Sequence, residues 1–139
     1  HRGPDDEGRW MNDNKSVFLG QRRLSIIDLS SAGHQPMCNE NNTLQIIFNG
    51  EIYNFQEIKN ELLLLGHKFK SKTDTEVILH GYEQYGESIV LKLRGMFSFA
   101  IYNTLTNEIF IARDRLGIKP LYYVPVSYTH LTLPTSDLV

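Results

Sequence analysis

Residues 96–114, MFSFAIYNTLTNEIFIARD, hold the pattern that decides the fold. Apolar side chains alternate with others in residues 96–103 and again in residues 108–114. The connection between the two runs, Thr104 to Asn107, is short and mostly polar. Alternation with a period of two buries one face of a strand, and a short polar connection joins neighbouring antiparallel strands. The stretch therefore predicts a β-hairpin with one face in a core.

Two helices are predicted before this hairpin. The first begins with the capping-box pattern Asn54-Phe55-Gln56-Glu57 and ends at Gly66. Its apolar residues follow helical spacing: Phe55, Ile58, Leu62 and Leu65. The second is capped by Ser71 or Thr73, with Glu76 three residues after Thr73, and ends at Gly86. Its apolar face consists of Val77, Ile78, Tyr82 and Tyr85.

Short strands are predicted nearer the start of the chain, over residues 16–19, 23–28 and 44–49, which are rich in Val, Ile and Phe. The order is strands, two helices, then strands, so the fold class is α+β rather than a βαβ repeat. The opening residues 1–6 have turn composition with no element before them, which predicts a chain that starts inside a longer protein.

Composition excludes several classes of protein. The 139 residues carry a formal net charge of -2, without a run of Lys or Arg, so neither nucleic acid nor a membrane is expected as partner. The single cysteine, Cys38, predicts a reducing cytoplasmic compartment and is expected to be an inert thiol in a loop. The five histidines lack the spacing of metal ligands, so no metal site is predicted.

Polar residues at the ends of predicted strands are the candidate site. Asn49-Gly50-Glu51 follows the buried-looking strand Leu44 to Phe48, and its amide donor and close backbone N–H could form an oxyanion hole. A plain Asn-Gly turn is the alternative. Arg23 could clamp a carboxylate, although a solvated arginine is the usual role. Asp74 opens a helix, where the helix dipole favours a carboxylate for structural reasons alone.

Several separated segments, taken in order, are far more specific than any one residue. They are His1-Arg2-Gly3-Pro4-Asp5, Arg23-Leu24-Ser25-Ile26-Ile27-Asp28, Gln35-Pro36, Asn49-Gly50-Glu51-Ile52-Tyr53-Asn54, Ser71-Lys72-Thr73-Asp74-Thr75-Glu76, Gly95-Met96-Phe97-Ser98-Phe99-Ala100, and residues 113–123. The chain from His1 to about Tyr123 resembles the glutaminase domain of glutamine-hydrolysing asparagine synthetases. These domains are class II glutamine amidotransferases with the N-terminal-nucleophile fold.

The resemblance implies a four-layer αββα sandwich. Residues 1–125 would be the amidotransferase domain, truncated at its N-terminus and lacking the first strand of the family. Residues 126–139 do not resemble the family and are expected to be a tail that arose as a sequence-assembly artefact.

The resemblance also implies a glutamine site. Arg23 would bind the α-carboxylate of glutamine in a pocket that Leu24, Ile26 and Ile27 line. Asp74 would pair with the α-ammonium group, and Glu51 would help to order the site. The Asn49 side chain and the Gly50 N–H would hold the oxyanion.

The nucleophile of the family is an N-terminal cysteine, and the chain begins at His1 without it. The residues given are therefore expected to bind glutamine but to be inactive alone. ATP and Mg would belong to a synthetase domain of the parent protein, which could be a homodimer, and no cofactor is expected in this chain. Two alternatives stay open: the glutaminase half of an enzyme with a sugar-phosphate, phosphoribosyl, peptide or polysaccharide acceptor, and a non-catalytic glutamine-binding module.

Overall fold

The structure is a computed structural model, which describes residues 6–23 and 30–126. Its elements, in chain order, are β1 (Asp6–Met11), β2 (Phe18–Arg23), the 3-10 turn η1 (Ser31–Gly33), β3 (Met37–Cys38), β4 (Leu44–Ile52), α1 (Phe55–Leu64), α2 (Asp74–Tyr85), the 3-10 turn η2 (Gly86–Leu91), β5 (Gly95–Asn103) and β6 (Glu108–Arg113).

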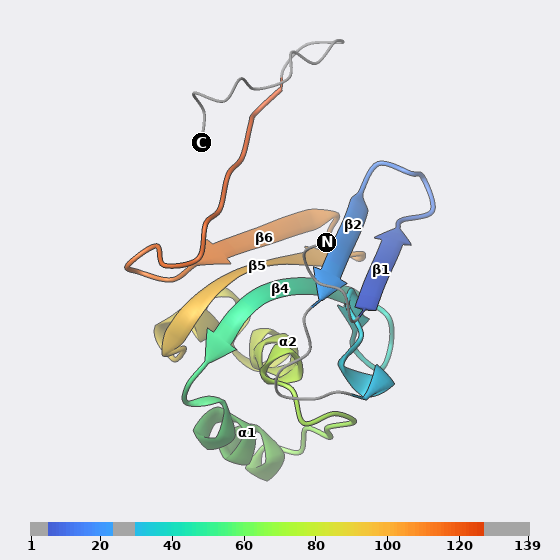
Figure 1. The fold of residues 1–139 in the computed structure, drawn as a ribbon. Coiled ribbons are helices and arrows are strands. Elements are labelled where there is room, and N and C mark those ends of the chain that lie inside the picture. Colours follow the sequence, from blue (N-terminus) through green and yellow to red (C-terminus); the bar gives the residue numbers. More distant parts are fainter. Residues whose placement is uncertain (1–5, 24–29, 127–139) are drawn as a thin grey trace.

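An antiparallel sheet of order β3-β4-β5-β6 forms the centre of the fold (Figure 1). The predicted hairpin is confirmed as β5 and β6, which pair from Ser98 opposite Arg113 to Asn103 opposite Glu108. β4 pairs with β5 along its whole length, with Phe48 opposite Phe99. Alternation along these strands gives the sheet two distinct faces.

One face of the sheet is covered by α1 and α2 (Figure 1). Ile46 and Ile101 of the sheet and Leu62 and Val77 of the helices are completely buried in this layer. Burial of each such side chain stabilises the fold by roughly 1.5–3 kcal/mol, so this layer is the main core of the domain.

The other face of the sheet carries the hairpin β1–β2. The Trp10 and Tyr102 ring centroids lie 5.5 Å apart, and the Gln21 side-chain amide donates to the Phe48 carbonyl at 3.3 Å. Helices, sheet and hairpin thus form successive layers, and the predicted α+β class with antiparallel sheets is confirmed.

Both predicted helices are present, with two corrections at the first. Asn54 precedes α1, but its side chain bonds to Lys92 O and Arg94 N, each at 2.9 Å, instead of capping the helix. Leu65 is 52% exposed and is not part of the buried face, because the helix ends at Leu64 and the chain turns at Gly66.

The predicted cap of α2 is confirmed at Thr73, whose hydroxyl accepts from the Glu76 N–H at 3.3 Å. The Glu76 carboxylate turns back to the Ser71 N–H at 2.6 Å. Burial opposes ionisation of Glu76, but hydrogen bonds from His80, Ser71 and two backbone amides lower its pKa to about 2. The ionised Glu76 side chain and its hydrogen bonds to the Ser71 segment therefore fix the start of α2.

The predictions were least accurate before β4. The strand predicted over residues 16–19 overlaps β2 only at residues 18 and 19, because β2 begins at Phe18. The strand predicted over residues 23–28 lies outside the described residues except for Arg23. β1 was not predicted, because its sequence DEGRWM is polar and its outer side is exposed. Cys38 lies in the short strand β3 rather than in a loop. No helix in the described ranges is long and apolar enough to cross a bilayer.

Candidate active site

The segment Asn49-Gly50-Glu51 lies inside β4 and is not a turn, which corrects both the predicted strand end and the alternative of an Asn-Gly turn. Gly50 lies opposite Phe97 of β5 and has a φ of 149°. A Cβ atom at this position would lie 2.1 Å from the Met96 carbonyl oxygen. Glycine is therefore required here by the pairing of β4 with β5.

Beyond β3, the edge of β4 is open to side chains from other segments. The Phe48 N–H donates to Gln35 Oε1 at 2.7 Å, and the Ile52 N–H donates to Asp74 Oδ2 at 3.0 Å. Backbone groups of alternate residues point to the same edge of a strand, so the Gly50 N–H points to this edge as well, between the other two. The edge thus presents a backbone donor between a buried amide and a buried carboxylate.

Asp74 is the first residue of α2 and is only 4% exposed. Burial raises the pKa of its carboxyl group above the usual value, and the negative charge of Glu51 adds to this effect. Hydrogen bonds from the Ile52, Asp74 and Thr75 amides act in the opposite direction but do not cancel it. An anion in this position is stabilised by a cationic group brought next to it.

Gln35 holds the two sides of the edge together, a role that was not predicted from the sequence. Its side-chain oxygen accepts from β4, and its Nε2 donates to Thr75 Oγ1 of α2 at 3.3 Å. The residue is 4% exposed, and its peptide bond to Pro36 is cis. The motif Gln35-Pro36 drew attention to this residue in the sequence, but its bonding partners could not be predicted because they lie 13 and 40 residues away.

The structure describes the side chains of only some of the other predicted site residues. Asn49 and Glu51 are exposed on the face of β4 opposite the buried Phe48 and Ile52. Arg23 is the last residue of β2, paired through its backbone with Asp6, and its side chain lies outside the described residues. The same applies to three further predicted residues: Leu24, Ile26 and Ile27.

The loop after β6 contains another buried carboxylate, Asp114. Its oxygens accept from the N–H groups of Phe97, Ile118 and Lys119 at 2.9–3.1 Å. These hydrogen bonds, led by that from Lys119, lower the Asp114 pKa to about 2, and the positive charge of Arg113 contributes. Asp114 therefore fixes the loop after β6 against β5.

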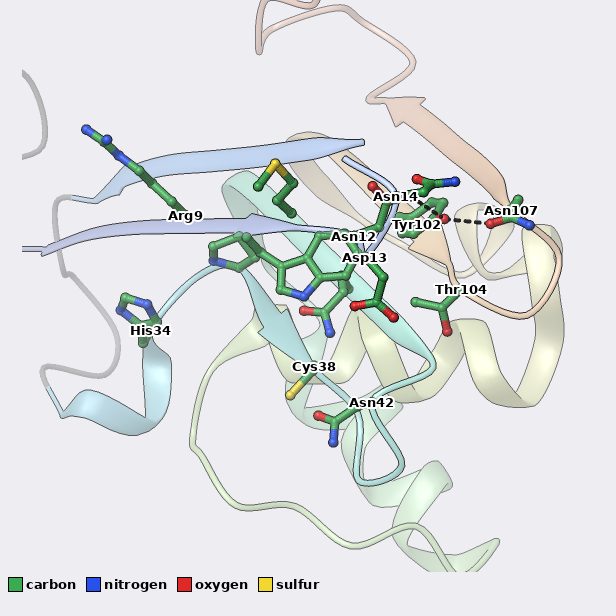
Figure 2. A pocket seen from close by; sticks show the side chains of 14 residues that line it. Arg9, Asn12, Asp13, Asn14, His34, Cys38, Asn42, Tyr102, Thr104 and Asn107 are labelled. Carbon is green, nitrogen blue, oxygen red and sulfur yellow. Dashed lines mark hydrogen bonds between the residues drawn. The ribbon is translucent and has the colours of Figure 1, made fainter. Parts of the chain in front are cut away.

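A surface cavity of about 590 Å³ lies elsewhere, between the β1–β2 turn and the β5–β6 turn (Figure 2). Within it, the Tyr102 hydroxyl accepts from Asn12 at 3.2 Å and donates to Asn107 at 2.8 Å. Cys38 also lines this cavity. None of the predicted site residues in the described ranges does, so the cavity is separate from the β4 edge.

The β4 edge, with its polar groups facing the start of α2, is compatible with amidotransfer chemistry. Comparison with known proteins identifies the class of protein. Residues 1–136 match the glutamine amidotransferase domain family, and the chain belongs to this family. In fold, the chain is similar to the glutamine phosphoribosylpyrophosphate amidotransferase of B. subtilis, with a TM-score of 0.63 and 25% identity over 74% of this chain and 24% of that chain.

Asparagine synthetases are among the curated relatives with high identity. The glutamine-hydrolysing asparagine synthetase 1 of Bacillus subtilis (strain 168) is 48% identical over 91% of this chain and 20% of its own length. Amidase chry2 of Gibberella zeae is 44% identical over 88% of this chain and 18% of its own length. The chain thus spans about one fifth of the length of these relatives.

Proposed function

We propose that this chain is the glutaminase part of an ATP-dependent asparagine synthetase. In that reaction L-aspartate, L-glutamine, ATP and water give L-asparagine, L-glutamate, AMP and pyrophosphate. The observation that carries the proposal is the β4 edge, where Gly50 lies two residues before Ile52, whose N–H donates to the buried Asp74 carboxylate. A backbone donor and a carboxylate so close together suit the carboxamide and the α-ammonium group of one amino-acid amide. The 48% identity to an asparagine synthetase supports the same acceptor.

Each end of glutamine would have a partner of opposite charge. The α-ammonium group would bind the Asp74 carboxylate, whose charged form is disfavoured by burial and would be stabilised by a cation. Glu51 adds negative potential beside it. The α-carboxylate would bind Arg23, with Leu24, Ile26 and Ile27 around it, since bidentate recognition of carboxylates suits a guanidinium group.

The reacting carboxamide would then lie at the exposed segment Asn49–Glu51 of β4. A thiolate attacks the carboxamide carbon, ammonia leaves after protonation, and water hydrolyses the resulting thioester to glutamate. The oxyanion formed on attack would accept hydrogen bonds from the Gly50 N–H and the Asn49 side-chain amide. Gly50 is held rigidly by its pairing with β5, so this donor is in place before reaction.

The thiolate would come from an N-terminal cysteine of the full-length protein, whose α-amino group serves as base. Cys38 is not suited to this role, because it lies at the separate cavity. ATP and Mg would be bound by a synthetase domain of the same parent protein, which receives the ammonia. A cytoplasmic homodimer is the setting that we propose for that parent.

The test uses a longer version of the protein that begins at the cysteine. Its glutaminase activity should fall by about 10²- to 10³-fold in kcat on Asn49→Ala, with little change in KM, and should survive Cys38→Ser. Residues 1–139 alone should release no ammonia from glutamine. Turnover by residues 1–139 that Cys38→Ser abolishes would contradict the placement of the site.

Two other functions are separable by simple assays. Similarity to a phosphoribosylpyrophosphate amidotransferase fold favours, as a second candidate, a glutaminase that feeds another acceptor. Asparagine formed from aspartate and glutamine by the full-length protein would exclude that acceptor class. Glutamine binding without ammonia release by the cysteine-bearing form would instead indicate a non-catalytic binding module.

A further inference from the structure

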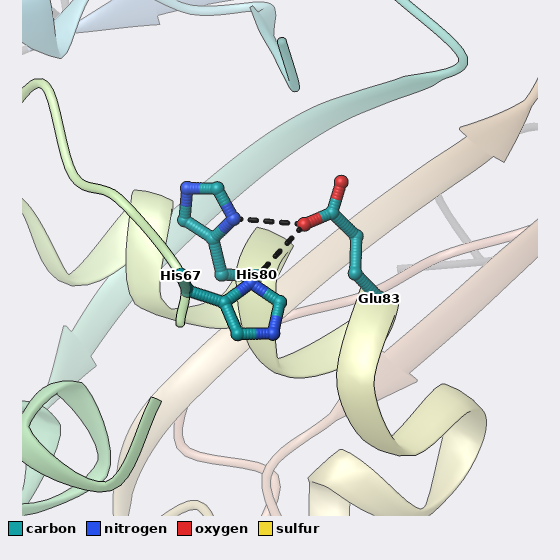
Figure 3. Close-up of side chains that lie close together, drawn as sticks. All are labelled: His67, His80 and Glu83. Carbon is teal, nitrogen blue, oxygen red and sulfur yellow. Dashed lines mark hydrogen bonds and ion pairs between the residues drawn. The ribbon is translucent and has the colours of Figure 1, made fainter. Parts of the chain in front are cut away.

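A cluster of two histidines and a glutamate lies at the second half of α2 (Figure 3). His80 and Glu83 are one helical turn apart, and His67 comes from the segment between α1 and α2. Glu83 Oε2 lies 2.8 Å from His80 Nδ1 and 3.5 Å from His67 Nδ1. One oxygen and two nitrogens therefore converge, and all three lie within 4.8 Å of one another.

The second ring nitrogen of each histidine lies near a separate side-chain oxygen. His80 Nε2 lies 3.4 Å from Glu76 Oε1 and 3.5 Å from Glu40 Oε1, and His67 Nε2 lies 2.9 Å from Gln84 Oε1. Metal-binding histidines characteristically donate their second N–H to a carboxylate or carbonyl oxygen, which fixes the ring and its tautomer. Both rings have such an acceptor.

The carboxylate is oriented in the same way. Glu83 Oε1 accepts from the Asn39 side-chain amide at 2.7 Å, so Oε2 is the oxygen directed at the two rings. His80 is further fixed by the edge of the Phe69 ring, whose centroid lies 4.8 Å away. The side chains are sheltered but still reachable from solvent, with exposed fractions of 2% for His80, 16% for His67 and 23% for Glu83.

We propose that His67 Nδ1, His80 Nδ1 and Glu83 Oε2 bind one divalent transition-metal ion such as Zn²⁺. Nitrogen and oxygen ligands about 2.0–2.2 Å from tetrahedral zinc are roughly 3.4 Å apart. The His67–Glu83 separation of 3.5 Å already fits, and the His80–Glu83 separation of 2.8 Å requires a small outward shift of the carboxylate. The two ring nitrogens lie within 4.8 Å of each other, so rotation of the more exposed His67 ring would complete the site. Three protein ligands leave a fourth position for water.

The bound ion would connect the segment after α1 to the helix whose first residue is Asp74. Because the ligands come together only in the folded chain, binding should stabilise the fold by an amount that grows with the logarithm of the metal concentration above the Kd. The competing explanation is an ion-pair network in which a protonated His80 lies among Glu40, Glu76 and Glu83 with no affinity for metal. The two explanations differ in metal affinity and in the response of thermal stability to metal.

The test is a calorimetric titration of the 139-residue chain with ZnCl₂, with Co²⁺ absorption as a probe of tetrahedral geometry. One ion per chain should bind, and Zn²⁺ should raise the Tm. His67→Ala and Glu83→Gln should each weaken binding by more than about 100-fold, because each removes a direct ligand, whereas loss of a residue that only holds a ligand typically costs roughly 10- to 100-fold. Gln84→Ala should fall in that smaller range.

Two matched controls are available. His34→Ala removes another exposed histidine, and Glu87→Gln removes a glutamate four residues after Glu83 that is not in the cluster. Both should keep the affinity and the rise in Tm. Glu83→Gln preserves an oxygen for Asn39, so its circular dichroism spectrum should match that of the unmodified chain. Absence of one-to-one binding, or equal affinity in His67→Ala and the unmodified chain, would overturn the proposal.

Discussion

Asp74 at the start of α2 and Asp114 at the end of β6 are both buried carboxylates that accept from an amide of a neighbouring strand, yet their pKa values move in opposite directions. Both also accept from further backbone amides. Desolvation has the larger effect at Asp74, where the nearby charge is Glu51, whereas amide hydrogen bonds have the larger effect at Asp114, where the nearby charge is Arg113.

The difference separates a structural carboxylate from a candidate binding group. Asp114 is already stabilised as an anion by its own loop, so a ligand has little to add. Burial disfavours the Asp74 anion, so a cation placed beside it would stabilise its charged form. Four changes to these two regions would test the distinction.

The largest expected effect is on the strand that carries the site. Gly50→Ala should lower the free energy of unfolding by about 3 kcal/mol or more, because its Cβ would meet backbone atoms of β5 at 2.1 Å and 2.7 Å. The matched change Gly117→Ala, in the Asp114 loop, should cost only about 1–2 kcal/mol, since its φ of 64° is strained but its nearest neighbour is the flexible Arg113 side chain. Urea denaturation measures both, and equal losses would contradict the rigid role of Gly50.

The next effect concerns glutamine. Asp74→Asn should weaken glutamine binding by roughly 10- to 150-fold, the range of about 1.5–3 kcal/mol for a hydrogen bond to a charged group. Asp114→Asn, in material that remains folded by circular dichroism, should retain the affinity. Calorimetric titration with L-glutamine measures both constants. A similar loss in the two variants would remove the functional distinction between the carboxylates.

As the pH falls, Asp74 and Asp114 should change the free energy of unfolding in opposite directions. The Asp114 pKa of about 2 lies below the unfolded value of 3.8, so its contribution is complete above about pH 4 and is lost as the pH falls toward 2. Asp74 has a raised pKa, so protonation in the folded state relieves an unfavourable charge as the pH falls through that pKa. Asp114→Asn should therefore flatten the acid loss of stability, and Asp74→Asn should steepen it, as measured by unfolding at a series of pH values.

The smallest expected effect is the change in the free energy of unfolding that Asp74→Asn causes at neutral pH. Asparagine keeps an oxygen for the Ile52 N–H and removes a disfavoured charge, so the free energy of unfolding should change by less than about 1 kcal/mol. Asp114→Asn should be clearly destabilising, because at Asp114 the backbone N–H groups stabilise the charge more than burial disfavours it, whereas at Asp74 burial has the larger effect. A larger loss of unfolding free energy in Asp74→Asn than in Asp114→Asn would contradict this distinction between the two carboxylates.

Local patterns in the sequence were sufficient for α2 and for the β5–β6 hairpin. The apolar positions Val77 and Ile78, the Thr73 cap and the Gly86 stop act within a few residues, so periodicity and capping chemistry predict them. Residues quoted in the family resemblance, including Asn49, Gly50 and Asp74, also identified the class of protein before their positions were known.

Only the tertiary structure decided which polar groups meet. Asp74 contacts Ile52 across 22 residues, Gln35 joins β4 to α2, and His67 faces Glu83 across the α1–α2 connection. The same structure places Asn49-Gly50 within a strand instead of a turn, because β5 supplies the pairing partner. A sequence pattern records preferences of neighbouring residues, whereas strand pairing, burial and the resulting pKa values depend on segments that only folding brings together.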